Sequence, residues 1–231
     1  MKPILIALFL LGNPAHASVF DDHVTPSLLD GFDHTGLWIA AGGLLATTLA
    51  QSQDYKMREE FSENKRVPES TTKIGDFLGT GVPGALTALI QLSLDPEMGA
   101  AHAEALIDTM IVTSALKYSA GRGRPDSDNH HSMPSGHTST TFATATSLAY
   151  AYGWKTAVPL YMAAVFTGVT RMSDDAHWFS DTVAGATVGL FWGRATYFHH
   201  AAKKEKADSE GSAFLPVLTS KYAGLIWKFR F

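Results

Sequence analysis

Apolar segments rich in small residues alternate with short polar clusters along the chain, and this pattern predicts a helical protein. The predicted helices are residues 36–50, 99–117, 136–154, 156–170 and 182–197. The small residues within them would let neighbouring helices approach closely. Segment 77–94 is also uncharged, but its glycines and Pro83 predict a kinked or irregular first half. The body of the chain is therefore expected to be all-α.

The segments differ in how many polar and charged residues they contain. The uncharged segment 36–50 predicts a buried helix or a short membrane helix. Residues 54–68 carry many charges and predict a solvated helix or loop, and residues 199–212 predict a polar linker beyond a solvated helix end at His199-His200. The predicted helix 99–117 holds ionisable residues that would be costly against lipid.

The last residues differ in character from the rest. Residues 213–218 and 224–231 predict two short strands, and aromatic and aliphatic positions alternate in the second. A short C-terminal β-hairpin or strand, packed on the helical body or on a second copy of the chain, is the expected arrangement.

The first residues have the pattern of a secretory signal peptide, residues 1–17. Met1-Lys2 is a short basic start, residues 4–11 are apolar, and Ala15-His16-Ala17 is a small-x-small cleavage site. The apolar run is shorter than the ~20 residues that cross a bilayer. We expect export to the periplasm or to the periplasmic face of an envelope membrane. The alternative is an N-terminal helix that packs on the body.

Composition narrows the function classes. The chain has 231 residues, enough for one domain with a sizeable core, and its net charge of −4 does not suggest a nucleic-acid partner. It has no cysteine, which excludes disulfides and cysteine metal sites. Mean hydropathy is near zero, which favours a body that is soluble or peripherally attached to a membrane over an integral one.

Three polar clusters carry the candidate chemistry. They contain Lys117, Arg124 and Pro125; then Pro134, Ser135, Gly136 and His137; then Arg171, His177 and Asp181. The cations and the glycine N–H could surround an oxyanion. If a helix ran through His177, Asp181 would lie one turn further on the same face, where a carboxylate could fix the imidazole tautomer. Such a group resembles a phosphate site with a nucleophile and an acid.

These clusters and their spacings resemble the three-part signature of the type 2 phosphatidic acid phosphatase superfamily. That superfamily also contains bacterial class A acid phosphatases and vanadium haloperoxidases. The resemblance covers residues 71–200 and implies a helical bundle of about six core helices. The implied division is a signal peptide, an N-terminal helical region at 18–70, the catalytic core at 71–200 and a C-terminal part at 201–231.

The resemblance also implies roles for the residues. His177 would attack phosphorus and form a phosphohistidine, Asp181 would orient it, and His137 would act as acid and then as base. The expected phosphate-binding groups are Lys117, Arg124, Ser135, Gly136 and Arg171. No metal or other cofactor is expected. Arg122 lies outside the signature and is expected to be a loop cation, and His130 and His131 to lie in an exposed loop.

The implied reaction is hydrolysis of phosphate monoesters or pyrophosphates at a membrane surface. The expected substrates are envelope lipids of the phosphatidic acid, phosphatidylglycerol phosphate, undecaprenyl pyrophosphate or lipid A type, because Gly-Arg-Gly-Arg-Pro resembles the lipid-phosphatase branch. Alternatives are a nonspecific periplasmic acid phosphatase, a vanadate-dependent haloperoxidase and a non-enzymatic phosphate-binding protein. The sequence leaves the oligomeric state open.

Overall fold

The computed structural model describes residues 25–64, 67–211, 213–218 and 223–228, and the side chains of residues 26–64 and 67–206. The expected signal peptide, residues 1–17, lies outside the described residues. The helices are α3 (Thr25–Gly31), α4 (His34–Gln51), α5 (Asp54–Arg58), the π-helix η2 (Glu59–Glu63), α6 (Glu69–Gly79), α7 (Val82–Leu94), α8 (Pro96–Ala120), α9 (Gly136–Tyr152), α10 (Trp154–Ser173) and α11 (Phe179–Gly211). The expected all-α class is confirmed for this helical body.

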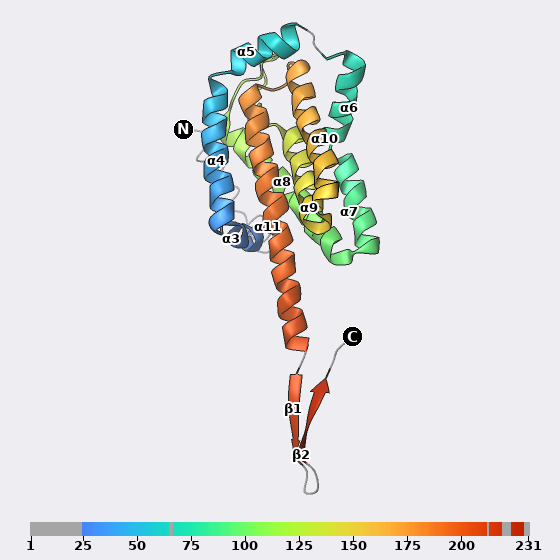
Figure 1. The fold of residues 1–231 in the computed structure, drawn as a ribbon. Coiled ribbons are helices and arrows are strands. Elements are labelled where there is room, and N and C mark those ends of the chain that lie inside the picture. The colour runs from blue at the N-terminus through green and yellow to red at the C-terminus, as the bar shows by residue number, and fades with distance from the viewer. Residues whose placement is uncertain (1–24, 65–66, 212, 219–222, 229–231) are drawn as a thin grey trace.

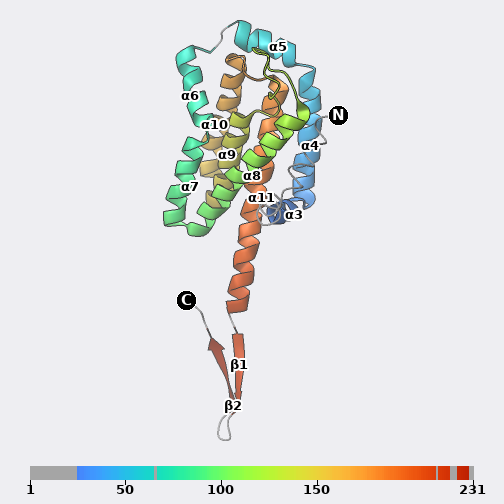
Figure 2. The same cartoon turned by 180° about the vertical axis from the view of Figure 1, so that it is seen from behind.

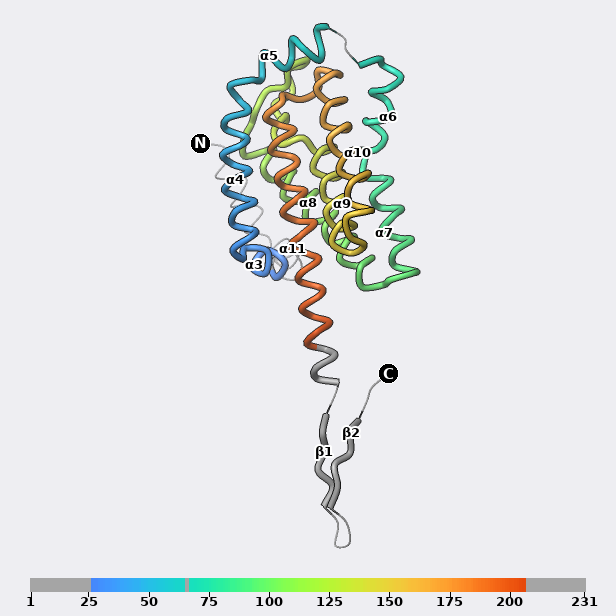
Figure 3. Tube along the Cα trace, in the orientation of Figure 1, coloured from blue at the N-terminus to red at the C-terminus, as the bar shows by residue number. Residues whose placement is uncertain are grey.

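Helices α8, α9, α10 and α11 form the centre of the bundle (Figures 1 and 2). Helix α9 packs against the other three, while α4 covers α11, α6 covers α10 and α7 covers α8. The Cα trace in Figure 3 shows α4 and α7 on opposite sides of this centre. The arrangement brings both ends of the long loop between α8 and α9 close to the start of α11.

A row of glycines explains how closely α11 approaches α9. An added Cβ atom at Gly185, Gly189 or Gly193 would lie 2.5, 2.3 and 2.7 Å from backbone carbonyl oxygens of α9 or its cap. These positions repeat every four residues, so they line one face of α11. Small residues in the predicted helices therefore do allow close helix contact, and this contact fixes α11 beside the N-terminus of α9.

The outer helices expose large apolar side chains. On α4, Trp38 is 67% and Leu44 70% exposed, so the expectation that residues 36–50 form a buried helix is wrong. Among the helices that the structure describes, none is by itself both long and apolar enough to cross a membrane. Helices α6 and α7 meet that test only as a pair, with a 43° bend between them. The bend confirms the predicted kink in segment 77–94.

Two further segments differ from expectation. Residues 201–211 continue α11 as helix where a linker was predicted, because their Ala, Lys and Glu residues are strong helix formers. In the charged segment 54–68, Asp54 is buried rather than solvated. Its partners, described below, explain why this carboxylate is held inside.

Beyond α11, the chain has the strands β1 (Ala213–Leu218) and β2 (Ala223–Lys228), with Ala213 opposite Lys228 in an antiparallel register. The all-α assignment concerns the helical body and does not depend on these two strands. The expected packing of the hairpin on the body or on a second copy lies outside the described side chains.

Candidate active site

The three polar clusters lie at the end of the bundle that α5 covers (Figure 2). Lys117 is in the last turn of α8, Ser135 is the N-cap residue of α9, and Arg171 is in the last turn of α10. His177 precedes α11, and Asp181 lies in its first turn. Residues from four separate helix ends can therefore face the same space.

Hydrogen bonds join the clusters to one another. The Lys117 ammonium donates to the backbone carbonyls of His131 at 2.7 Å and Ser132 at 3.3 Å, just before the second cluster. The Ser135 N–H donates to the carbonyl oxygen of Asp181 at 2.9 Å, which joins the second cluster to the third. The loop between α8 and α9 is thus fixed at both ends.

His177 and Asp181 form a close pair, but not a helical one. His177 Nδ1 lies 3.6 Å from Asp181 Oδ2. The helix begins only at Phe179, so the condition of a helix running through His177 is not met. The Ser132 hydroxyl donates to Asp181 Oδ2 and lies 3.4 Å from His177 Nδ1. It therefore sits between the carboxylate and the imidazole.

Burial controls the charge of this pair. The pKa of His177 is lowered to about 4, mainly by burial and also by the charges of Lys117 and Arg124, although Asp181 opposes this shift. Burial alone would raise the pKa of Asp181, but its hydrogen bonds and the charge of Arg122 hold that pKa below its usual value. At neutral pH the pair is a neutral imidazole beside an ionised carboxylate.

The expected phosphate-binding groups surround the start of α9. Gly136 is its first residue, and a Cβ added there would lie 3.9 Å from the Lys117 side chain. The Ser135 hydroxyl accepts a hydrogen bond from Thr138 at 3.0 Å, which leaves its own proton available. Because the N-terminus of a helix attracts anions, this end of α9 is suited to a negatively charged group.

Arg124 and Lys117 place positive charge near the N-terminus of α9. The Nε atom of Arg124 is buried without a hydrogen-bond partner in the described structure. The charge of Arg124 lowers the pKa of both His137 and His177, so it acts on both imidazoles. Burial, followed by the charge of Arg124, lowers the pKa of Lys117 to about 8.

His137 and Arg171 meet at a carboxylate that sequence reasoning missed. Asp76 Oδ1, on α6, lies 3.1 Å from His137 Nε2 and accepts a hydrogen bond from Arg171 Nη1 at 2.7 Å. Burial and the charge of Arg171 lower the pKa of His137, whereas Asp76 opposes this. No sequence spacing relates Asp76 to the three clusters.

Arg122 is also more than a loop cation. It donates from Nη1 to Asp181 Oδ1 at 2.7 Å and to the Ser180 hydroxyl at 2.6 Å. Its Nη2 donates to the buried Asp54 at 2.6 Å, and Asp54 also accepts from the Ser180 N–H at 2.8 Å. The expectation for Arg122 is wrong because its loop folds inward over Trp178, 5.6 Å from the ring centroid. The presence of a second arginine, Arg122, beside Arg124 in the Gly-Arg-Gly-Arg-Pro run was the available signal.

The other histidines lie apart from these groups. His130 is exposed, as expected, while His131 is partly buried against Tyr118. His199 and His200 do not form a solvated helix end: they lie 2.7 Å from Asp30 and Glu104, respectively. Within residues 26–64 and 67–206, no three His, Asp or Glu side chains are grouped to hold a metal ion.

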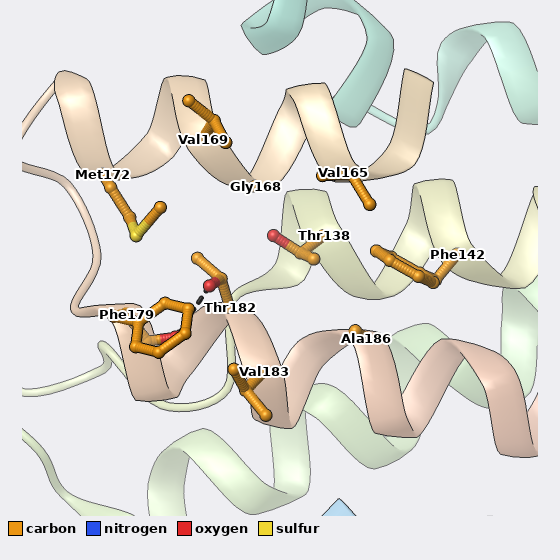
Figure 4. Close-up of a pocket in the computed structure, with 10 residues that line it drawn as sticks. All are labelled: Thr138, Phe142, Val165, Gly168, Val169, Met172, Phe179, Thr182, Val183 and Ala186. Carbon is orange, nitrogen blue, oxygen red and sulfur yellow. Dashed lines mark hydrogen bonds between the residues drawn. The ribbon is translucent and has the colours of Figure 1, made fainter. Parts of the chain in front are cut away.

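An apolar pocket of about 170 Å³ lies between α9, α10 and α11 (Figure 4). Phe142, Val165 and Met172 are among the residues that line it. Thr138 also lines it, and the same threonine donates to Ser135. The pocket is therefore directly adjacent to the second cluster.

Comparison with known proteins agrees with this arrangement. The family model of the PAP2 superfamily matches residues 99–205. The lipid A 1-phosphatase of Porphyromonas gingivalis is 43% identical over 90 residues, which are 38% of this chain and 20% of the relative. The lipid A 4'-phosphatase of Helicobacter pylori is 33% identical over 85 residues, 36% of this chain and 41% of the relative. The chain thus spans less than half the length of either relative.

A solved structure shares the fold. The crystal structure of Aquifex aeolicus LpxE matches with a TM-score of 0.56 and 20% sequence identity, over 62% of this chain and 93% of that one. At this identity the likeness concerns the fold alone. The family match covers residues 99–205, which hold all three clusters, so this region of the chain carries the pattern of the PAP2 superfamily.

Proposed function

We propose that this protein is a phosphatase that hydrolyses phosphate monoesters or pyrophosphates through a phosphohistidine at His177. The observation that carries the proposal is a buried, neutral imidazole, backed by Asp181 and facing the charges of Lys117 and Arg124. A neutral imidazole has the free lone pair that nucleophilic attack requires. The nearby cations would attract the phosphoryl group that it attacks.

The reaction has two in-line steps. In the first, the free ring nitrogen of His177 attacks phosphorus, the bond to the leaving oxygen breaks, and His137 gives that oxygen a proton. In the second, His137 takes a proton from water, the water oxygen bonds to phosphorus, and the phosphorus–nitrogen bond breaks to release phosphate. Asp181 would stabilise the positive charge that the His177 ring carries in the phosphohistidine formed between the two steps.

The remaining groups would hold the equatorial oxygens, where negative charge is concentrated in the transition state. In this proposal they are Lys117, Arg124, Ser135, the N–H of Gly136 and Arg171. Because these donors are fixed by helix ends and by the hydrogen bonds described above, they need little reorganisation during the reaction. Removing one of them should slow turnover on the order of 100-fold.

The proposed substrates are lipid phosphates of the cell envelope, presented at a membrane surface. Two relatives are named for activity on lipid A, and an apolar pocket adjoins the phosphate site. Exposed apolar side chains on α4 and α7 give the body surfaces suited to contact with lipid. Within this class, phosphatidic acid, phosphatidylglycerol phosphate, undecaprenyl pyrophosphate and lipid A are the candidates to assay.

The mechanism is tested by trapping the intermediate. Purified protein is mixed with a ³²P-labelled substrate and quenched within milliseconds, and acid-labile, base-stable label on the protein is counted. His177→Ala should lose both label and turnover, whereas His34→Ala, at an exposed histidine of α4, should keep both. Full activity of His177→Ala would refute the mechanism.

Substrate assays separate this proposal from its alternatives. A nonspecific acid phosphatase would hydrolyse a water-soluble aryl phosphate as fast as a dispersed lipid phosphate. A vanadate-dependent haloperoxidase would oxidise halide when vanadate and peroxide are added, whereas we expect vanadate only to inhibit phosphatase activity. A protein that only binds phosphate would turn over neither the aryl phosphate nor the lipid phosphate.

The proposed location is the periplasm or the periplasmic face of an envelope membrane. Cell fractionation and N-terminal sequencing of the purified protein test it, because signal-peptide cleavage would leave Ser18 as the first residue. A protein that retains Met1 in the cytosolic fraction would contradict this part of the proposal.

A further inference from the structure

Helix α6 packs unusually closely against the candidate site. A Cβ added at Gly75 would lie 2.0 Å from the Thr170 side chain, and one at Gly79 would lie 2.4 Å from the Cβ of His137. These two glycines are four residues apart and therefore share the face of α6 that meets α9 and α10. Asp76 follows Gly75, so this close contact is what brings its carboxylate to His137.

The Asp76 carboxylate contacts both the expected acid and a phosphate-binding cation. Its Oδ1 lies 3.1 Å from His137 Nε2 and 2.7 Å from Arg171 Nη1. Half of its side chain is exposed, whereas the Arg171 side chain is only 12% exposed. The carboxylate is therefore partly open to solvent beside His137.

Charge is distributed unevenly across the site. Arg171 is paired with two carboxylates, Asp76 at 2.7 Å and Asp174 at 3.0 Å. On the side of His177, the described part of the chain places no carboxylate within ion-pair distance of Lys117 or Arg124. Positive charge without a carboxylate partner therefore lies beside the nucleophile, whereas the half-exposed charged group beside His137 is the Asp76 carboxylate.

We propose that Asp76 determines specificity, by favouring phosphate monoesters with an uncharged alcohol or sugar leaving group over diphosphates. This inference rests on the proposed phosphatase function. A monoester places a neutral alcohol next to Asp76 once His137 has protonated the leaving oxygen, and sugar hydroxyls can donate to the carboxylate. A diphosphate instead places a second phosphate, with its negative charge, beside Asp76. Like charges this close in a partly buried site are repelled, which discriminates between the two substrates.

A matched pair of substrates tests this inference. The kcat/KM values for a prenyl monophosphate and the corresponding prenyl diphosphate are measured in the same detergent, for the wild type and for Asp76→Asn. We expect the diphosphate-to-monophosphate ratio to rise about tenfold in Asp76→Asn, because one unit of repulsion is removed at short range. Asp76→Glu should keep the wild-type preference.

Asp174→Asn is the matched control, because Asp174 also pairs with Arg171 but has no recorded contact with His137. Its ratio should stay within about twofold of the wild type, since the Asp174 carboxylate contacts Arg171 but not His137, beside which the leaving group would lie. An unchanged ratio in Asp76→Asn, an equal rise in Asp174→Asn, or loss of turnover on both substrates in Asp76→Asn would overturn the inference. No turnover by the wild type on either substrate would instead overturn the proposed function, and this inference with it.

Discussion

Arg122 Nη1 lies 2.7 Å from Oδ1 of Asp181, while the other terminal nitrogen of the same guanidinium lies 2.6 Å from Asp54. One arginine thus connects the carboxylate behind the proposed nucleophile to helix α5, which is more than 120 residues distant in sequence from Asp181. Both carboxylates are almost fully buried, and the charge of Arg122 helps to hold the pKa of Asp181 below its usual value. Arg122 is therefore a positioning residue for the His177–Asp181 pair.

Replacing Arg122 should lower turnover and change its pH dependence. In Arg122→Ala, Asp181 loses its cationic partner, so the pKa of Asp181 rises and the acidic limb of the kcat profile moves to higher pH. We expect turnover to fall at least tenfold at neutral pH, with only partial recovery in Arg122→Lys, since lysine cannot form both bonds of the planar fork. Steady-state kinetics between pH 4 and 9 measure both effects.

Arg58 provides the matched control. It makes two hydrogen bonds to Asp175 and also lies over Trp178, but it makes no recorded contact with Asp181. Arg58→Ala should leave the position of the acidic limb unchanged. A lower turnover without any shift of that limb in Arg122→Ala would mean that Arg122 stabilises the fold and does not position Asp181.

The sequence pointed to the residues of the three clusters but not to the carboxylates that contact them. Motif spacing predicted that Lys117, His137 and His177 belong to one site, and their catalytic roles stay predictions. Spacing could not reveal Asp54 or Asp76. A carboxylate becomes part of a site only when the packing of the helices brings it there. Asp54 reaches Ser180 because α5 lies over the start of α11, and Asp76 reaches its partners because α6 packs closely on α10.

The exposure of α4 and the length of α11 also show what a short stretch of sequence can and cannot predict. Residues 36–50 have the composition of a buried helix, yet their exposure depends on whether another helix covers the outer face of α4. The helical continuation at 201–211 follows local propensity, which the charge of the segment concealed. Propensity and burial are separate properties, and only the first can be read from a short segment.

The pH dependence of kcat/KM should have a mildly acidic optimum. Burial lowers the pKa of His177 to about 4, so this nucleophile is neutral and active above that pH. Burial also lowers the pKa of His137 below its ordinary value of 6.5, so the acid loses its proton as the pH rises toward neutrality. We expect kcat/KM to be highest between these limits, after correction for ionisation of the substrate near pH ~6. An optimum above pH ~8 would contradict these charge states.

Helix α6 lies so close to His137 that a side chain should not fit at Gly79. A methyl group there would lie 2.4 Å from His137, so Gly79→Ala must displace α6 or the imidazole and should lower turnover at least tenfold. Gly42→Ala is the control, because a Cβ on that residue of α4 meets no atom within 4 Å. It should stabilise the protein by about 0.5–1 kcal/mol through its helix propensity and leave turnover unchanged. Equal turnover in the two variants would show that His137 does not depend on α6.

Asp108, in the middle of α8, should make the protein less stable as the pH rises. Its side chain is fully buried, and neither carboxylate oxygen has a hydrogen-bond partner in the described structure. Burial, with the nearby charge of Glu104, raises the pKa of Asp108 to about 7, from 3.8 in an unperturbed carboxyl group. The folded protein therefore keeps this proton where the unfolded chain has lost it, and stability declines between those two pH values.

Asp108→Asn removes the titration, so the wild type should lose roughly 3 kcal/mol of unfolding free energy relative to this variant between pH 4 and 8. Urea unfolding at several pH values measures the difference. Thr109→Val is the matched control, because the Thr109 hydroxyl is likewise buried without a partner but does not titrate in this range. Its stability difference from the wild type should be the same at every pH. Parallel curves for the wild type and Asp108→Asn would mean that Asp108 is ionised in the folded protein throughout, and hence that a cation or solvent reaches it inside the bundle.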